Sequence, residues 1–190
     1  MANLGKRRIL LCALAAAAAM SLSACGNGNA AQQQTTAQEQ TTKKEVALSD
    51  IHEAVKAVNG ENYLPSMMQE TDYITALYGV SEDMYEEVIA EVSMISAHVD
   101  TFLAFKAKEG QADAIEEKLN DYREYLLNDS LQYPMNIPKI QASQVVREGD
   151  YVFFVQLGTV EDDMVDEDEL LQQYKESNQL AVDAIKEQFQ

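Results

Sequence analysis

An amphipathic segment at residues 109–129 constrains the fold of this chain more than any other feature of the sequence. Apolar residues recur there three and four positions apart, and charged residues occupy most positions between them. The apolar set is Ala112, Ile115, Leu119, Tyr122 and Leu126. This spacing predicts a surface helix whose apolar stripe must be buried against a second layer.

Alternating segments on both sides of this helix can supply that layer. Residues 87–96 and 99–108 predict two strands of a hairpin, and residues 139–158 predict two more around a tight turn, with Ile140 and Ala142 in the first of them. Helical patterns at 47–60 and beyond Leu170 flank these elements, and Pro65 breaks the pattern between helix and strands. We therefore expect an α+β fold with two layers. An antiparallel four-stranded sheet in ββ-α-ββ order carries the long helix on one face, with flanking N- and C-terminal helices.

The first 24 residues have the organisation of a lipoprotein signal peptide. Three basic residues precede an apolar stretch of 14 residues at 9–22, which is short for a membrane span of about 20. The stretch leads into Leu22, Ser23, Ala24 and Cys25. These four residues resemble the lipobox of bacterial lipoproteins, in which the chain is cut before the cysteine and the cysteine sulfur carries diacylglycerol. The resemblance predicts Cys25 as a lipidation site, and the alternative is an ordinary cleavable signal with an incidental cysteine.

The remaining chain divides by composition into three parts. Residues 25–46 begin with the lipidated cysteine and continue as a Gln/Thr-rich stretch without hydrophobic periodicity, which predicts a disordered tether. Residues 47–160 form the expected α+β globular domain, and residues 161–190 hold an acidic run and a C-terminal helix. The sequence thus predicts a domain held at the cell membrane by its lipid and facing outside the cytoplasm.

Charge and cysteine content exclude several classes of function. The chain has a formal charge of −18, and loss of the predicted leader leaves 11 basic and 32 acidic residues, a formal charge of −21. Such a chain repels nucleic acids and favours cationic partners. Both cysteines, Cys12 and Cys25, lie outside the predicted domain, so disulfides, thiolate metal sites and cysteine nucleophiles are excluded there. No cofactor-binding motif is present, and we expect no cofactor.

Three segments resemble a known family of small bacterial lipoproteins, the domain of unknown function 4358. They are the "LYGV" segment at 77–80, the "AHVDTFLAFKAKEG" segment at 97–110 and the "GDYVFFV" segment at 149–155. The resemblance covers roughly residues 49–158. It implies an envelope location and a modular shape, and it carries no activity or catalytic residues.

Two groups of residues are candidates for chemistry. His98 and Asp100 stand two residues apart on a predicted strand, so an imidazole beside a carboxylate could act as a general base or a metal ligand. The acidic run offers seven carboxylates that could bind calcium, although the EF-hand spacing is absent. They are Glu161, Asp162, Asp163, Asp166, Glu167, Asp168 and Glu169. A hairpin-edge histidine and a solvated charge run are the plainer interpretations.

The function that this sequence favours is a non-enzymatic binding or accessory module at the cell envelope. Its partners would be an envelope protein, a wall component or a cationic ligand, in addition to the membrane that holds Cys25. A small enzyme using His98 and Asp100, and a calcium-responsive module, are the alternatives.

Overall fold

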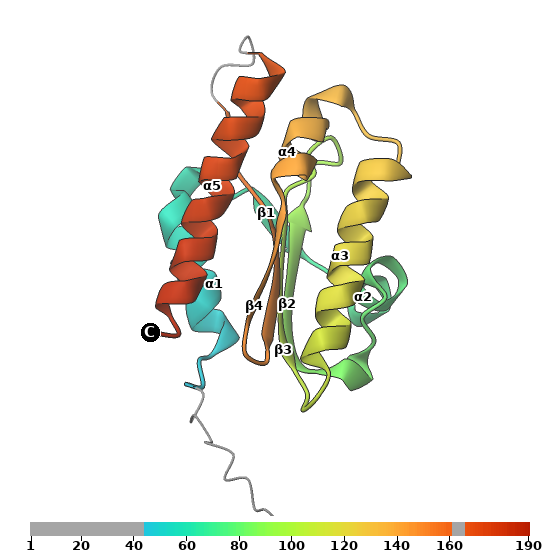
Figure 1. The fold of residues 1–190 in the computed structure, drawn as a ribbon, viewed down its shortest axis with the longest axis vertical. Coiled ribbons are helices and arrows are strands. Elements are labelled where there is room, and N and C mark those ends of the chain that lie inside the picture. The colour runs from blue at the N-terminus through green and yellow to red at the C-terminus, as the bar shows by residue number, and fades with distance from the viewer. Residues whose placement is uncertain (1–43, 161–165) are drawn as a thin grey trace, which may run out of the picture. The chain divides into compact units, whose positions relative to one another are not determined.

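The computed structural model describes residues 44–160 and 166–190, and its centre is a five-stranded antiparallel sheet (Figure 1). The strands run in the order β1-β2-β3-β5-β4. Their bounds are β1 Pro65–Met68, β2 Tyr85–Ser93, β3 Thr101–Ala107, β4 Gln144–Glu148 and β5 Tyr151–Gln156. The hairpins β2–β3 and β4–β5 join side by side through β3 and β5, where Leu103 pairs with Phe154. Both predicted hairpins are confirmed.

Five α-helices accompany this sheet in the described part of the chain. They are α1 Leu48–Asn59, α2 Thr71–Tyr78, α3 Ala112–Asn128, α4 Ile137–Ala142 and α5 Glu167–Glu187. Short 3-10 turns lie at Gly60–Asn62, Glu82–Met84 and Pro134–Asn136. The α+β class is confirmed, and the predicted long helix is α3, which buries Ile115 and Leu119 against the sheet.

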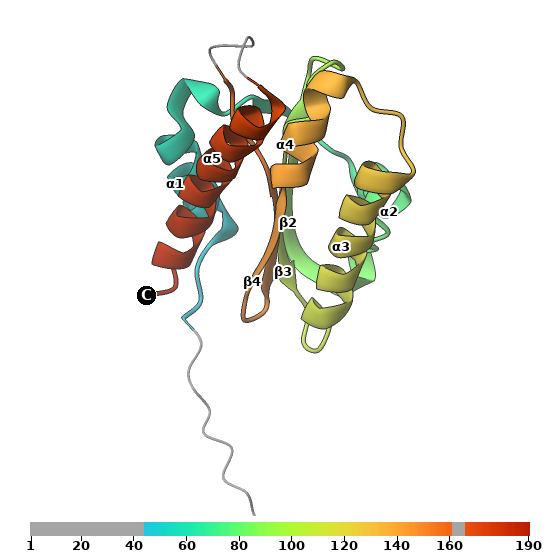
Figure 2. The same cartoon turned by 45° about the horizontal axis from the view of Figure 1, so that its top comes forward.

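The prediction of two layers is wrong, because helices cover both faces of the sheet. On one face, α2, α3 and α4 pack over Leu103, Phe105 and Phe154. On the other, α1 and α5 pack over Phe102, Phe153 and Val155 (Figure 2). Since the central strands "TFLAFKA" and "YVFFVQ" carry apolar side chains on both sides, each face needs its own cover. That requirement makes three layers.

The predicted number of four strands is also wrong, and one predicted strand segment is helical. Residues Pro65–Met68 form a fifth strand, β1, at an edge of the sheet, which is where a strand tolerates proline. Ile140 and Ala142, expected in a strand, lie in α4. Pro138 sits in the first turn of that helix, the position at which proline favours a helix start.

The C-terminal helix packs on the sheet as part of the same core. Ala181, Val182 and Ile185 are buried against the α1 face. At Gly158, where φ is +113°, an added Cβ would lie 2.7 Å from the Cβ of Ser177 on α5. Glycine therefore suits both the backbone conformation and the close approach of α5.

Several sequence-based assignments lie outside the described residues. These are the signal peptide, the lipobox Leu22, Ser23 and Ala24, the lipidated Cys25, and the tether up to residue 43. The last residues assigned to the tether contact the domain, since Val46 is buried and hydrogen-bonded to Tyr151. Among the helices that the structure describes, none has the length and apolar character needed to cross a membrane.

Candidate functional site

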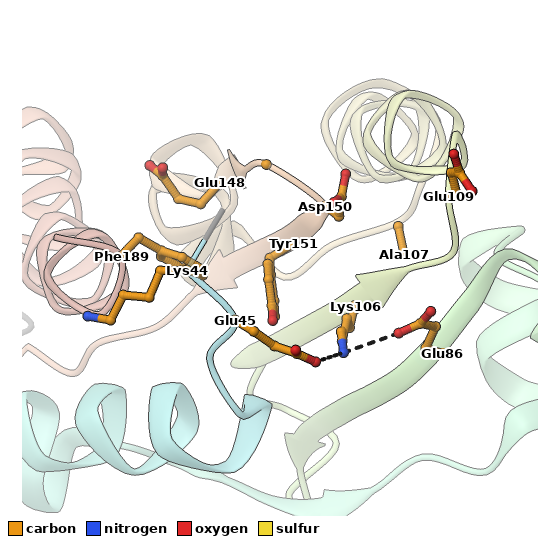
Figure 3. A pocket seen from close by; sticks show the side chains of 11 residues that line it. Lys44, Glu45, Glu86, Lys106, Ala107, Glu109, Glu148, Asp150, Tyr151 and Phe189 are labelled. Carbon is orange, nitrogen blue, oxygen red and sulfur yellow. Dashed lines mark hydrogen bonds and ion pairs between the residues drawn. The ribbon is translucent and has the colours of Figure 1, made fainter. Parts of the chain in front are cut away.

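A cleft of about 440 Å³ opens where β3 ends and β4 turns into β5 (Figure 3). Five carboxylates line it: Glu45, Glu86, Glu109, Glu148 and Asp150. The lining has two ammonium groups, from Lys44 and Lys106, so its formal charge is −3. We call these residues, together with Tyr151 and Phe189, the acidic cleft. Its size is within the range of small-molecule sites, and its charge favours a cation.

Lys106 lies between two of these carboxylates. Its Nζ is 2.7 Å from Oε1 of Glu45 and 3.1 Å from Oε2 of Glu86. Both contacts raise the pKa of Lys106, with the hydrogen bond to Glu45 as the larger cause, and the same bond lowers the pKa of Glu45. Figure 3 shows the three side chains in a row. The amine of Lys106 is thus held by carboxylates from two separate segments of the chain, Glu45 and Glu86.

Aromatic side chains form one wall of the acidic cleft. The rings of Tyr151 and Phe189 are 5.0 Å apart with an interplanar angle of 59°. The Tyr151 hydroxyl donates to the carbonyl of Val46 at 2.9 Å and accepts from its N–H at 3.1 Å. Tyr151 is therefore held by the backbone that leads into α1.

The opposite end of β3 holds a buried ion pair. Nζ of Lys139, from α4, lies 2.6 Å from Oδ2 of Asp100, and both side chains are almost fully buried. Burial raises the pKa of Asp100, and the Lys139 ammonium opposes that rise. The ammonium also lies 5.1 Å from the centre of the Tyr174 ring. Burial, aided by the Asp100 carboxylate, raises the pKa of Tyr174.

The structure brings the predicted pair His98 and Asp100 together. Nδ1 of His98 is 4.0 Å from Oδ2 of Asp100, and both residues lie in the loop before β3 rather than within a strand. Because Asp100 is fully buried and already bound by Lys139, its carboxylate is held as a structural counter-ion. The arrangement suits a fixed loop better than proton transfer to a substrate.

The second histidine belongs to another cluster. The ring of His52, on α1, stacks on the ring of Phe102 with 5.5 Å between their centres. Its Nε2 is 2.9 Å from both the Tyr63 hydroxyl and Oε2 of Glu91, and that hydroxyl donates to Glu91 at 2.8 Å. Burial is the main cause of the raised pKa of Tyr63. This cluster joins α1 to β2.

The acidic run is only partly described. Glu161, Asp162 and Asp163 lie outside the described residues. Asp166 caps α5 by accepting the N–H of Glu169 at 2.9 Å, and Glu167, Asp168 and Glu169 occupy its first turn, where negative charge stabilises a helix. Within residues 44–160 and 166–190, no three histidine, cysteine or acidic side chains are grouped so that they could hold a metal ion.

Comparison with known proteins adds a family to this geometry. The family described as domain of unknown function (DUF4358) matches residues 59–157. The chain belongs to this family. The matched region holds the whole sheet with α2, α3 and α4, whereas α5 and all but the last residue of α1 lie outside it. No curated protein and no solved structure matches the sequence.

The sequence alone did not predict the acidic cleft, the buried Lys139–Asp100 pair or the His52 cluster. The acidic cleft draws its residues from the N-terminal segment, β2, β3, the β4–β5 turn and the C-terminal end, so no local motif marks it. The sequence did not predict Lys139 as the partner of Asp100, because the two residues are 39 positions apart in the chain. The charge excess was the one available signal, and it indicates cationic partners without placing a site.

Proposed function

We propose that this chain is a lipid-anchored binding module of the cell envelope whose acidic cleft takes a cationic group of its ligand. The observation that carries the proposal is the cleft itself, a hollow of about 440 Å³ with five carboxylates and an aromatic wall. Carboxylates pair with an amine or guanidinium, and an aromatic face adds cation–π attraction. The sequence contributes the location, through the lipobox that ends at Cys25.

The ligand charge is tested by titrating the full chain, purified from membranes in a non-ionic detergent, with a short linear diamine. Calorimetry should detect binding to the diamine and none to its diacetylated, uncharged form. Raising the salt concentration should weaken the binding, because charges near the surface are screened within about 8 Å at physiological ionic strength. Equal binding of both forms would contradict a cation site.

The location of binding is tested by a matched pair of variants. Glu109→Gln with Glu148→Gln removes two carboxylates from the cleft and should weaken diamine binding by about tenfold, equivalent to about 1.4 kcal/mol. Glu117→Gln with Asp121→Asn removes two exposed carboxylates from α3, outside the cleft, and should leave binding unchanged. If both variants lose affinity alike, the whole charge of the chain and not the cleft attracts the ligand.

The anchor has its own test. Mass spectrometry of the chain isolated from its native membrane should find Cys25 as the N-terminal residue with diacylglycerol on its sulfur. An unmodified sulfur, or a chain that keeps its leader, would contradict the lipidated form. Binding in the cleft can succeed or fail independently of this result.

A further inference from the structure

Two loops at the end of the sheet opposite the acidic cleft carry exposed apolar side chains. Met94 and Ile95 lie in the β2–β3 loop, and the others lie between α3 and the start of α4. Six residues make up this apolar cap, with exposed fractions in parentheses: Met94 (70%), Ile95 (61%), Leu131 (103%), Tyr133 (63%), Met135 (69%) and Ile137 (36%). Asn136 ties the two loops together by donating to the carbonyl of Ala97 at 3.0 Å. Figures 1 and 2 both show the β2–β3 loop beside α4.

The size of the apolar cap indicates a contact surface. Six large side chains with these exposed fractions place on the order of several hundred Å² of apolar area at one end of the domain. Exposed patches of that size on single chains commonly mark sites of association. Methionines suit such a surface because their flexible side chains adapt to the shape opposite them.

The two loops that carry the apolar cap hold little charge, in a chain with a formal charge of −18, although the acidic first turn of α5 lies at the same end of the sheet (Figure 1). In the loop segments 93–99 and 128–138, the only acidic or basic residues are His98 and Asp129. The acidic cleft, with its charge of −3, lies at the other end of β3. Two copies of so acidic a chain repel each other over most of their surface, so they can meet closely only where carboxylates are missing. Within their own residues, the two loops of the apolar cap meet that condition.

This end of the domain offers both a protrusion and a recess. Leu131 protrudes completely, and it borders a hollow of about 240 Å³ between the end of α3 and α4. Leu126, Ile137 and Ile140 supply apolar lining to the same hollow. A two-fold contact requires the same patch on both partners, each offering a protrusion that fits the other's recess.

We propose that the apolar cap binds a second copy of this chain, with Leu131 of each copy seated in the hollow between α3 and α4 of the other. The two acidic clefts then point away from the contact. This association is independent of what the cleft binds.

The partner is tested by cross-linking the full chain in its native membrane. Leu131→Cys and Met94→Cys variants, treated with a flexible bifunctional maleimide, should each give a covalent dimer. Leu180→Cys is the matched control, because Leu180 is 55% exposed on α5 and lies outside the apolar cap. Dimer yields no higher than those of the control would overturn the proposal. Cross-links only to other proteins or to lipid would overturn it as well.

The contact is tested by sedimentation velocity of the full chain in detergent at rising protein concentration. The dissociation constant of the dimer should rise at least about tenfold in Leu131→Asp, since a symmetric contact loses that side chain twice. Leu180→Asp should leave the dissociation constant unchanged. Because Leu131 and Leu180 are both exposed, both variants should keep the unfolding temperature of the parent chain at concentrations where all three are monomers. A monomer at every concentration, or equal effects of the two variants, would refute the two-fold contact.

Discussion

The two ends of β3 carry ion pairs of nearly equal length in opposite surroundings. At one end Lys139 and Asp100 are 2.6 Å apart, and their side chains are 5% and 0% exposed. At the other end Lys106 and Glu45 are 2.7 Å apart, and the exposed fractions are 23% and 78%. Water can hydrate the charges of the second pair if its ionic contact breaks, whereas it cannot reach the charges of the first pair. Because the two distances are almost the same, burial and not distance decides what each pair contributes to stability.

The surroundings also separate the roles of the two pairs. The buried pair joins α4 to the loop before β3 and so fixes the end of the sheet that carries the apolar cap. The exposed pair is part of the lining of the acidic cleft, where Glu45 is open to water and Lys106 is partly so. The buried pair Lys139–Asp100 holds neighbouring segments in place, which suits a contact surface. The hydrated pair Lys106–Glu45 can part at little cost, which suits a binding site.

The largest effect is expected from Lys139→Met. The variant leaves the Asp100 carboxylate buried without a counter-charge, so the free energy of unfolding should fall by about 3–5 kcal/mol. Urea unfolding of the purified chain measures this loss. Adding Asp100→Asn to the variant should restore part of it, because the uncompensated charge is gone. A loss of unfolding free energy below about 1 kcal/mol would show that the buried pair stabilises the fold no more than an exposed pair does.

The pH dependence of the same variant sharpens the comparison. Burial raises the pKa of Asp100 and Lys139 opposes the rise, so removal of Lys139 should raise that pKa further. A folded-state pKa above the unfolded value of about 3.9 means that the folded chain binds the extra proton. The stability of Lys139→Met should therefore increase as the pH is lowered from 7 toward 4, by up to about 1.4 kcal/mol per pH unit relative to the Asp100→Asn, Lys139→Met double variant.

Glu45 should respond to pH in the opposite direction. Its pKa is lowered by Lys106, so its stabilising contribution is present above the unfolded value of about 4.3 and is lost as the pH falls. Unfolding curves of Glu45→Gln and the parent chain should therefore converge in acid. If the two unfolding curves converged at high pH instead, the pKa of Glu45 would not be lowered in the folded chain.

An intermediate effect is expected from Tyr151→Phe. The hydroxyl satisfies both backbone groups of the buried Val46, and without it they lose their partner, at a cost of about 2 kcal/mol. Thermal unfolding measures the loss, and faster proteolysis near residues 44–47 should accompany it. Tyr133→Phe serves as the control, because Tyr133 is 63% exposed. Equal stability of the two variants would mean that the hydroxyl of Tyr151 does not hold the entry to α1.

The smallest effect is expected from Lys106→Met. Because water and salt compete for the charges of this exposed pair, the free energy of unfolding should change only slightly, and far less than in Lys139→Met. Repeating the urea unfolding at high salt should narrow even that difference. A loss as large as that of Lys139→Met would overturn the comparison between the two ends.

The sequence predicted those elements whose pattern extends over many residues. The stripe from Ala112 to Leu126 spans several turns and identified α3, and the alternation in β2 and β3 identified their hairpin. The short helix α4 has only six residues, too few for a helical period, so Ile140 was assigned to a strand. Pro138 was the available signal for it. The second helical layer could have been inferred from Phe153 and Phe154, since adjacent apolar residues in a strand face opposite sides.

The candidate site was much less accessible to sequence reasoning. His98 and Asp100 were paired because they are neighbours in the chain, but the decisive partner, Lys139, arrives through the fold. The acidic cleft unites side chains from Glu45 to Phe189, and only their excess charge was visible beforehand. Local patterns fix elements, whereas sites built from distant segments depend on the packing of those elements.

The position of α5 has a consequence for how the chain is made. Phe102, Phe153 and Val155 are covered on the α1 side in part by Ala181, Val182 and Ile185, which are among the last ten residues of the sequence. A ribosome must therefore extend the chain at least 25 residues beyond Gln156, the end of β5, before this apolar surface can be covered. A product that stops short of α5 leaves the surface bare and becomes a target for chaperones and proteases.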